Sequence, residues 1–306
     1  MIAQKTIKET IELQGVGLHN GENVNLVLKP AKADTGIIFK RTDIDSNKNI
    51  IKASYKNVDS PILCTKIKNS HGIVVSTIEH LMAVFYGENI DNVLIEIDAS
   101  EVPIMDGSSF DFVEAIRSVG TEDQNSNKKI IKVLKKVEVK DGDKSISIEP
   151  LKNDLIIDFE IVYKNELIRT RRKEFKLSSG DLTSIYSSKT FCLYEDIDQI
   201  KSLGLAKGGS LDNAIVVKDA KILNEDGLRY RDEFINHKIL DCLGDLMLTG
   251  HRLFGHIKTS RGGHQLTNTL LRTFLSDQSN WQFETFKENE KNQKTGLYSN
   301  PIAVNG

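Results

Sequence analysis

In both halves of this chain, strand-like patterns come first and helical patterns dominate the end. In a strand-like pattern apolar residues alternate with polar ones, whereas in a helical pattern they recur every three or four positions. The expected strands cover residues 6–13, 23–30, 92–98, 136–149 and 155–163, and the expected helices cover residues 76–87, 108–120, 233–250 and 265–275. Because strands and helices come largely in separate runs, the chain is predicted to fold as α+β layers and not as a wound parallel sheet.

The length of the chain, 306 residues, is sufficient for about two domains with cores that need no disulfide or metal. Between the halves, the segment "TEDQNSNKK" contains no apolar residue, which is typical of a linker. We therefore predict an N-terminal α+β domain over residues 1–122, a linker over 123–130 and a C-terminal α+β domain over 131–282. Residues 283–306 are polar and turn-rich, and they are predicted to form a loosely ordered tail.

Local signals mark where several of these elements start and stop. Ser76 is the expected N-cap of the first helix, and Glu79 three residues later completes a capping-box pattern. Gly87 and Gly120 are the expected C-terminal stops of the first and second helices. The dipeptide Asp-Gly at residues 141–142 predicts a hairpin turn between two strands.

The composition is that of an ordinary globular protein, with 39% hydrophobic residues, 27% charged residues and a net charge of -2. A chain so close to neutral is not expected to have nucleic acid as its main partner. No segment approaches the roughly 18 apolar residues of a membrane span, so the protein could touch a membrane but is not expected to cross it. Its three cysteines, Cys64, Cys192 and Cys242, are far apart and cannot all pair, which favours reduced thiols and a cytoplasmic location.

Four polar residues of the segment 233–250 fall on one face of the expected helix. At about 100° per residue, these four residues lie within an arc of about 100°. They are His237, Lys238, Asp241 and Asp245, and the opposite side carries Ile239, Leu240, Leu243, Leu246 and Met247. For this segment taken alone, such a stripe is more typical of the solvated face of a surface helix than of a metal site. Residues elsewhere in the chain must decide between the two interpretations.

A zinc hydrolase site would need a third ligand besides His237 and Asp241. Zinc in such a site takes three protein ligands and leaves a fourth position for water. His80 is a candidate, because Glu79 beside it could act as a general base on that water. The alternative for Glu79 is the purely structural capping role opposite Ser76.

The other histidines have different contexts. His264 follows two glycines and begins an expected helix, where a cationic imidazole is disfavoured unless a carboxylate such as Asp245 compensates. A functional role and a water-facing position fit this context equally well. His71, His251 and His256 lie in loop or strand-edge contexts and are interpreted as structural or exposed.

Several long motifs, taken together, resemble one enzyme family. They are "GVGLHNG", "LVLKPA", "STIEHLMA", "PIMDGSS", "DGDK", "GLAKGGSLDNAIVV", "LNEDGLRYRDEFINHKILDCLGDL" and the "GGH" before the last helix. In these motifs and their order, the chain closely resembles the UDP-3-O-acyl-N-acetylglucosamine deacetylases, the zinc enzymes of bacterial lipid A synthesis. The resemblance covers nearly the whole chain except its tail.

The resemblance implies both a fold and a reaction. The fold would be two similar domains, each a mainly antiparallel sheet layered against two helices, with small inserts and the active site at the domain junction. The reaction would be removal of the N-acetyl group from UDP-3-O-(3-hydroxyacyl)-N-acetylglucosamine, which gives acetate and the free amine in the committed step of lipid A biosynthesis. The implied cofactor is Zn2+, with Fe2+ as an alternative in the cell. The implied partner is this nucleotide-sugar glycolipid substrate, and the enzyme is expected to be a monomer.

The resemblance also implies roles for individual residues. His80, His237 and Asp241 would be the metal ligands, and Glu79 would be the general base on the bound water. Zinc can lower the pKa of such a water to about 7, which the hydrolysis of an unreactive amide requires. The departing amine would take its proton from Glu79 or from His264, and both remain candidates.

The remaining implied roles concern charge and substrate. His264 would act as a general acid or as a cationic stabiliser, with Asp245 orienting it and raising its pKa. Thr190 would help to hold the oxyanion of the tetrahedral intermediate, and Lys238 would bind substrate or support that charge. The residues matching substrate-lining positions are Phe191 and His19.

An insert over residues 194–218 resembles the family's second insert, which forms a passage for the acyl chain. A run of basic residues at 169–173 could bind a diphosphate, but it is more typical of a solvated strand end. The chain departs from the family pattern at Lys189, where an arginine is expected, so a bidentate contact there is in doubt.

Two other functions compete with this interpretation. A non-haem iron oxygenase also uses two histidines and one carboxylate, but it does not require a base such as Glu79. A non-catalytic binding module would leave the polar stripe on the surface and Glu79 as a helix cap.

Overall fold

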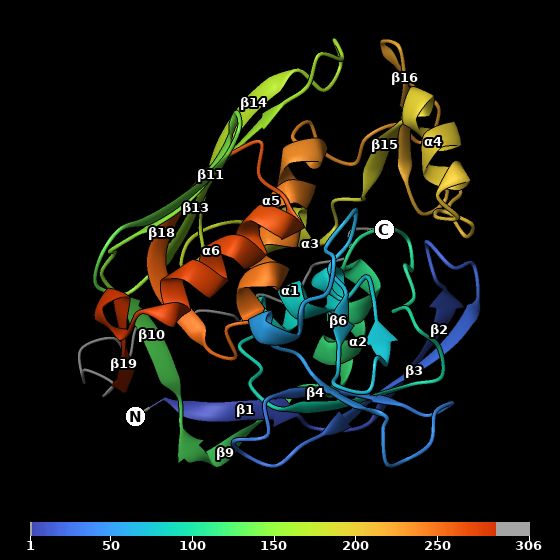
Figure 1. Cartoon of the computed structure of the whole chain (residues 1–306). Coiled ribbons are helices and arrows are strands. Elements are labelled where there is room, and N and C mark those ends of the chain that lie inside the picture. The colour runs from blue at the N-terminus through green and yellow to red at the C-terminus, as the bar shows by residue number, and fades with distance from the viewer. Residues whose placement is uncertain (1, 286–306) are drawn as a thin grey trace, which may run out of the picture.

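The computed structural model describes residues 2–285, which form two large sheets with helices between them (Figure 1). The first sheet has the strand order β2-β3-β8-β4-β5, and the second has the order β11-β12-β18-β10-β19, with β13 and β14 continuing from β18. Four helices lie in the layer between the sheets: α1 (Glu79–Gly87), α2 (Phe110–Val119), α5 (Glu233–Met247) and α6 (His264–Ser276). The mixed α+β class is therefore confirmed.

Both large sheets are mainly antiparallel. In the first sheet, β2 (Ile11–Val16), β3 (Asn23–Pro30), β4 (Ile37–Arg41), β5 (Ile50–Lys52) and β8 (Val93–Ile97) pair antiparallel except for β4 with β8. The second sheet contains β10 (Lys129–Val133), β11 (Val137–Asp141), β12 (Lys144–Glu149), β13 (Leu155–Val162), β14 (Thr170–Lys176), β18 (Arg252–Ser260) and β19 (Trp281–Thr285). There, β18 runs parallel to β10 and to β13, and the other pairs are antiparallel.

Smaller elements complete the described part of the chain. They are the ribbon of β1 (Ala3–Ile7) with β9 (Thr121–Asn127), the pair β6 (Ile67–Lys68) with β7 (Val74–Val75), and the sheet of β15 (Phe191–Leu193), β16 (Ile215–Lys218) and β17 (Lys221–Ile222). Short helices are α3 (Leu182–Tyr186), α4 (Ile197–Ser202) and the 3-10 turns η1 (Tyr55–Asn57), η2 (Tyr194–Asp196) and η3 (Gln278–Asn280). The predicted insert thus contains η2, α4 and β16, which project to one side of the helix layer (Figure 1).

Helices α1 and α5 form the centre of the molecule. All nine residues of α1 are buried, and in α5 the side chains of both the apolar face and the polar stripe are buried except for the partly exposed Lys238. The two helices touch closely at Gly244, where an added Cβ atom would lie only 2.0 Å from the carbonyl oxygen of Glu79. A glycine at this point lets the backbone of α5 approach the first turn of α1. The polar stripe is therefore an interior wall, and the solvated-face interpretation is wrong.

Several local predictions are confirmed. The expected strand over residues 23–30 is β3, and the expected hairpin at residues 141–142 joins β11 to β12, with Asp141 paired to Lys144. Gly120 is the C-terminal cap of α2 and has a positive φ of 78°. Such a left-handed conformation favours glycine, as the stop signal assumed.

The predicted capping box on the first helix is wrong. Helix α1 begins at Glu79, and its N-cap residue Ile78 offers no side-chain hydrogen bond. The Ser76 hydroxyl instead donates to the Ser100 carbonyl oxygen, at 3.2 Å, and Ser76 forms a β-bridge with Glu101. Thr77 has a positive φ of 55°, so the chain turns sharply before the helix starts. The Glu79 carboxylate is consequently free of the cap and available to the interior.

The predicted linker and tail also need correction. Residues Thr121–Asn127 are not irregular but form β9, which pairs antiparallel with β1. This strand is polar on both faces, and it is held by its backbone hydrogen bonds to β1 and by side-chain contacts such as the hydrogen bond from Gln124 to the Ala31 carbonyl oxygen, at 2.7 Å. At the other end, residues 283–285 belong to β19, and the rest of the predicted tail lies outside the described residues. None of the helices in residues 2–285 is long and apolar enough to span a bilayer.

Candidate active site

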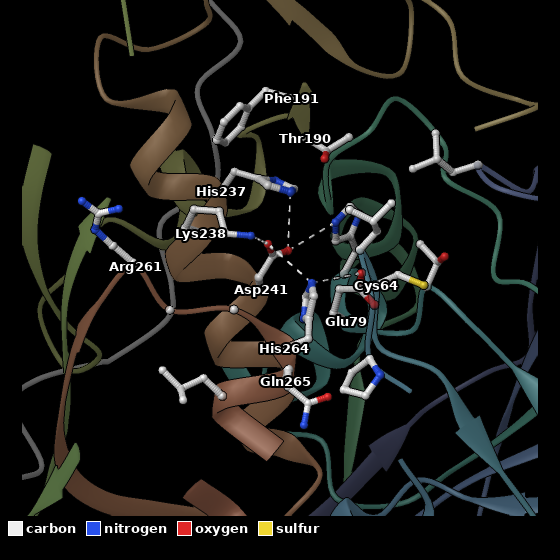
Figure 2. A pocket seen from close by; sticks show the side chains of 18 of the residues that line it. Cys64, Glu79, Thr190, Phe191, His237, Lys238, Asp241, Arg261, His264 and Gln265 are labelled. Carbon is white, nitrogen blue, oxygen red and sulfur yellow. Dashed lines mark hydrogen bonds and ion pairs between the residues drawn. The ribbon is translucent and has the colours of Figure 1, made fainter. Parts of the chain in front are cut away.

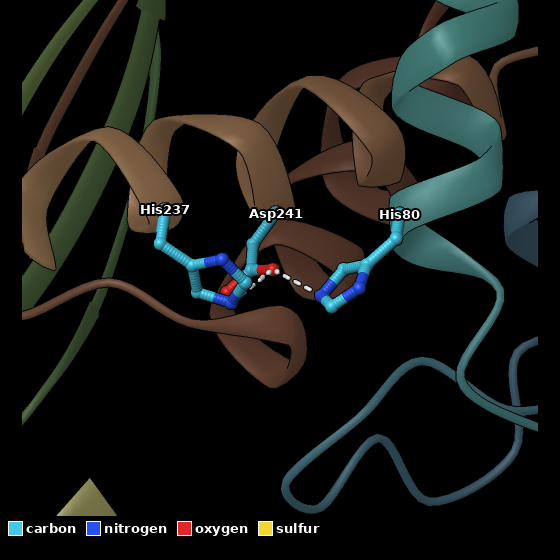
Figure 3. A group of neighbouring side chains, drawn as sticks. All are labelled: His80, His237 and Asp241. Carbon is cyan, nitrogen blue, oxygen red and sulfur yellow. Dashed lines mark ion pairs between the residues drawn. The ribbon is translucent and has the colours of Figure 1, made fainter. Parts of the chain in front are cut away.

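Three side chains that are distant in sequence meet between α1 and α5 (Figure 3). His80 comes from α1, whereas His237 and Asp241 lie one turn apart on α5. The Oδ1 atom of Asp241 lies 3.4 Å from Nε2 of His237 and 3.6 Å from Nε2 of His80. The two imidazole rings stand 4.9 Å apart and almost perpendicular to one another. The three predicted ligands are thus brought together.

The chemistry of this donor set fits a divalent metal ion. Asp241 Oδ1 is buried and has no hydrogen-bond partner among the described residues, which is costly unless a cation occupies the space beside it. Ligands held about 2.1 Å from a tetrahedral ion are separated from one another by about 3.4 Å, close to the two distances between Asp241 and the imidazoles. Nδ1 of His237 lies 3.0 Å from the Ser188 carbonyl oxygen, which holds the ring so that Nε2 faces Asp241.

The protonation states also suit metal binding. Burial lowers the pKa of His237 to about 3, against the opposing effect of Asp241, so its imidazole is neutral near pH 7. Burial acts to raise the pKa of Asp241, but the His237 ring and the Lys238 ammonium outweigh it and hold that pKa well below its usual range. Lys238 donates to Oδ2 of Asp241 at 2.6 Å. A neutral imidazole and an ionised carboxylate are the forms that coordinate metal ions.

Glu79 lies beside this group at the start of α1 (Figure 2). Its Oε2 atom accepts a hydrogen bond from the backbone N–H of Thr65, at 3.0 Å. Its Oε1 atom points to His264 and lies 3.7 Å from Nε2 of that ring. Burial raises the pKa of the Glu79 carboxyl, and the neighbouring rings of His264 and His80 offset only part of this effect. A carboxylate with a raised pKa is a stronger base, as proton abstraction near neutral pH requires.

His264 is the first residue of α6, with Gly263 as the N-cap. Its Nδ1 atom lies 2.9 Å from Oδ2 of Asp245, one turn beyond Asp241 on α5. Burial acts to lower the pKa of His264, but the Asp245 and Glu79 carboxylates outweigh it and raise that pKa to about 9. The imidazole is therefore cationic near neutral pH, and Asp245 supplies the compensation that a helix N-terminus demands.

Two adjoining cavities meet at this group. The first is polar, has a volume of about 500 Å³, and is lined by Glu79, His80, His237, Lys238, Asp241 and His264, and also by Lys144, Tyr163 and Arg261. The second is mostly apolar, has a volume of about 420 Å³, and is lined by residues of the insert that include Ile197, Ile200, Ala206, Leu211 and Val216. Leu18, His19, Leu63, Thr190 and Phe191 line both cavities.

The predicted substrate-site residues lie at this shared boundary. The backbone N–H of Thr190 donates to the Gly107 carbonyl oxygen at 2.7 Å, and Phe191 packs edge-on against Phe234 with the ring centroids 4.9 Å apart. The buried ring of His19 has no hydrogen-bond partner for either nitrogen among the described residues, and burial lowers its pKa. The structure thus brings all ten predicted site residues to the two cavities or directly behind their wall.

Other sequence interpretations have mixed outcomes. His71, His251 and His256 do not line either cavity, as expected for structural or exposed residues. The basic run at residues 169–173 also lies outside both, and Arg172 is paired with Asp158. Besides Lys238 and the cationic His264, Lys144 and Arg261 also line the polar cavity. Lys144 is the last residue of the "DGDK" motif, but the sequence analysis gave neither residue a role.

Comparison with known proteins shows the family to which the chain belongs. The family model described as UDP-3-O-acyl N-acetylglycosamine deacetylase matches residues 4–276. The chain belongs to this deacetylase family. Relatives named UDP-3-O-acyl-N-acetylglucosamine deacetylase come from Actinobacillus succinogenes, at 44% identity over 95% of this chain and 96% of the relative, and from Pasteurella multocida, at 44% identity over 95% of each. A relative of the same name from Haemophilus influenzae is 42% identical over 95% of this chain and 96% of its own length.

Membership of the deacetylase family confirms the resemblance that the motifs indicated. The longest motif, residues 223–246, contributes α5 and therefore the wall of the polar cavity. The motif at residues 76–83 contributes the start of α1, with Glu79 and His80. The "GGH" motif contributes the N-terminus of α6, where His264 faces the other two helices. These three motifs of the family therefore meet around one point.

Proposed function

We propose that this deacetylase removes the N-acetyl group from UDP-3-O-(3-hydroxyacyl)-N-acetylglucosamine, which yields acetate and the free amine in the committed step of lipid A biosynthesis. Membership of the family and the names of the relatives support the substrate class. The observation that carries the proposal is the convergence of two imidazoles, an ionised carboxylate and a separate buried carboxylate, Glu79, at one cavity. This combination is what metal-assisted amide hydrolysis requires.

The proposed cofactor is Zn2+, with Fe2+ as an alternative in the cell, held by His80, His237 and Asp241. A set of two imidazoles and one carboxylate is acceptable to both ions. Once bound, the ion would polarise the acetyl carbonyl and make a water molecule acidic enough to attack it near neutral pH.

Glu79 and His264 would carry out the proton transfers of the reaction. Glu79 is placed to take a proton from the attacking water, because it lies next to the ligand His80 and its pKa is raised by burial. His264, cationic near neutral pH, would stabilise the negative charge of the tetrahedral intermediate and could protonate the departing amine. Asp245 orients the imidazole and stabilises its charge.

The two cavities would bind different parts of the substrate. Lys144 and Arg261 supply cations on the wall of the polar cavity that suit the diphosphate. Lys238 would bind substrate or, with Thr190, support the developing charge of the reacting carbonyl. The apolar cavity of the insert suits the acyl chain. Phe191 and His19, at the boundary, would contact the sugar and the first part of that chain.

The organisation of the protein follows from the same reasoning. We infer two domains, residues 1–122 and 131–282, because each contains one large sheet and the site lies between helices of the two. We infer a monomer, because one chain supplies every residue of the site. A cytoplasmic location is supported by the three cysteines, all of which are free.

The competing functions make different predictions. A binding module with Glu79 as a helix cap is not supported, because Glu79 makes no capping contact and is buried at the cavity. An iron oxygenase would show oxygen-dependent turnover, whereas the hydrolase releases acetate equally well without oxygen.

The decisive experiment measures bound metal and acetate release from the UDP-sugar substrate in the wild type and in His237→Ala. We expect about one metal ion per chain and activity in the wild type, and loss of both in the variant. An active His237→Ala variant without metal would contradict the proposal.

A further inference from the structure

Thr65 lies where three helices meet, yet no motif pointed to it. The residue sits in the irregular segment between η1 and β6 and is only 2% exposed. Neither Thr65 nor its neighbour Asp245 lines the polar cavity, so both lie behind the wall that carries Glu79 and His264. A contact between Thr65 and substrate is therefore not expected.

The backbone of Thr65 is hydrogen-bonded to the start of α1. Its N–H donates to Oε2 of Glu79 at 3.0 Å, and its carbonyl oxygen accepts a hydrogen bond from the N–H of Ile78 at 3.3 Å. These two contacts fix one carboxylate oxygen of Glu79 and leave the other, Oε1, directed at His264. They would persist with any side chain at position 65 that keeps the same backbone.

The side chain of Thr65 forms hydrogen bonds with residues of the other two helices, α5 and α6. Its hydroxyl donates to Oδ1 of Asp245 at 2.5 Å and lies 3.1 Å from Nδ1 of His264. A hydroxyl has a single proton, so once that proton is given to Asp245, the oxygen presents a lone pair to the imidazole N–H. Oδ2 of Asp245 lies 2.9 Å from the same Nδ1. Thr65 and Asp245 together direct Nδ1 away from the cavity and Nε2 toward Glu79.

We propose that Thr65 is a positioning residue that holds the Glu79 carboxylate and the His264 imidazole at a fixed separation during hydrolysis. The inference rests on the proposed function, since it assigns these two groups to the reaction. Thr65 contacts Glu79 through its backbone N–H and His264 through its hydroxyl. Because both contacts come from one residue, neither the carboxylate nor the imidazole can move without disturbing its contact with Thr65. Within residues 2–285, Thr65 makes no hydrogen bond to His80, His237 or Asp241, so the positions of the proposed metal ligands do not depend on it.

The test compares Thr65→Val with Thr65→Ser. Valine keeps the branched shape and the backbone contacts but removes the hydroxyl, whereas serine keeps the hydroxyl and removes a methyl group. We expect Thr65→Val to lower kcat by about 10- to 100-fold, because a buried hydrogen bond to a charged group is lost. KM should stay within about twofold and bound metal should be unchanged, because a group that acts only on the reacting geometry affects kcat. Thr65→Ser should keep kcat within about threefold of the wild type.

Two outcomes would overturn the inference. One is a wild-type kcat in Thr65→Val, and the other is an equal loss of kcat in Thr65→Ser, which would show that packing and not the hydroxyl matters. If Thr65→Val does not fold, Thr65→Ala replaces it, and a folded Thr65→Ala with wild-type kcat also refutes the proposal.

A second measurement does not depend on turnover. In protein labelled with 15N at histidine, the Nδ1–H resonance of His264, assigned with His264→Gln, should shift in Thr65→Val and stay near its wild-type position in Thr65→Ser. An unchanged resonance in both variants would refute the contact even if the wild type proved inactive on the UDP-sugar. An inactive wild type with the expected shift would instead refute the proposed function and leave the positioning contact intact.

Discussion

The polar and apolar cavities share a boundary but are built in different ways. The polar cavity takes its chemical groups from α1, α5 and α6, of which the first two are buried along nearly their whole length. The apolar cavity takes its lining from the insert, where α4 has no buried residue and the strands are short. The reacting groups of the polar cavity need precise geometry, and they lie on helices that are packed in the core. The acyl chain of the substrate needs only a cavity of suitable shape, which the small peripheral insert provides.

The difference matters for how each cavity tolerates change. A charge in the polar cavity is surrounded by other buried charges, so its loss alters the protonation or position of its neighbours. A side chain in the apolar cavity makes non-directional contacts whose effect scales with area. Substitutions in the first should therefore change the rate of reaction, and substitutions in the second should change which acyl chains are accepted.

The largest effect is expected for Glu79→Gln. The amide keeps the size of the side chain but cannot accept the proton of the attacking water, so kcat should fall by about 1,000-fold. Bound metal should remain at the wild-type level, because the ligands are His80, His237 and Asp241. Steady-state kinetics together with metal analysis by mass spectrometry measure both quantities. Loss of metal in parallel with activity would show that Glu79 is part of the metal site itself.

The next effect concerns the pH dependence set by Asp245 and His264. If the cationic form of His264 is needed, kcat/KM falls on the alkaline side as the pH rises through the His264 pKa of about 9. In Asp245→Asn, burial, which lowers the pKa of His264, is no longer offset by the largest opposing charge. The fall should then begin at a lower pH, and activity near pH 8 should drop by about 100-fold. Profiles of kcat/KM between pH 6 and about 10 test this, and superimposable profiles would contradict it.

The same pKa has a consequence for stability. The pKa of His264 is higher in the folded protein than its ordinary value of 6.5, so protonation favours folding. This contribution is complete below about pH 6.5 and is lost as the pH rises through about 9. The denaturant midpoint of the wild type should therefore decrease over that range, and the decrease should be smaller in His264→Gln.

The helices and strands were predictable from the sequence to different degrees. Strand β3 shows clean alternation, because one face packs on the core, and the hairpin at residues 141–142 depends on turn residues alone. The predicted capping box at Ser76 is absent, because the backbone of Ser76 forms a β-bridge with Glu101 instead. Helix α1 therefore begins at Glu79, about one turn later than predicted. Strand β9 was missed for a similar reason, since its pairing with β1 cannot be seen in its own polar residues.

The candidate site shows the same limit. His80, His237 and Asp241 could be named because the motifs resemble a known family, whereas the helical pattern alone favoured a solvated face. Thr65 offered no local signal at all, because a single threonine in an irregular segment gains its role only when three helices close around it. Lys144, although part of the "DGDK" motif, and Arg261 were given no role from the sequence. Lys144 begins β12 and Arg261 follows β18, and only the assembled second sheet brings the two to the cavity.

A smaller effect is expected in the apolar cavity. Ile200 on α4 lines it, so Ile200→Trp should obstruct the space and lower kcat/KM by about 10-fold for a substrate with a long acyl chain. Substrates with a short acyl chain should be affected much less. The matched control is Leu203→Trp, because Leu203 is 64% exposed and does not line the cavity. Equal losses for both chain lengths would mean that the insert does not receive the acyl chain.

The smallest effect is expected at Lys189, which stands where the family pattern has an arginine. Its ammonium group donates to the Asp212 carbonyl oxygen at 2.8 Å and lines neither cavity, although Thr190 beside it lines both. Lys189→Arg should therefore change kcat and KM by less than about twofold, and Lys189→Ala should cost about 1 kcal/mol of unfolding free energy through the lost hydrogen bond. Kinetics and urea denaturation measure the two effects separately. A rate increase of tenfold or more in Lys189→Arg would mean that a bidentate contact at this position affects the reaction through the neighbouring Thr190. It would also show that the reaction depends on residues outside the three helices of the polar cavity.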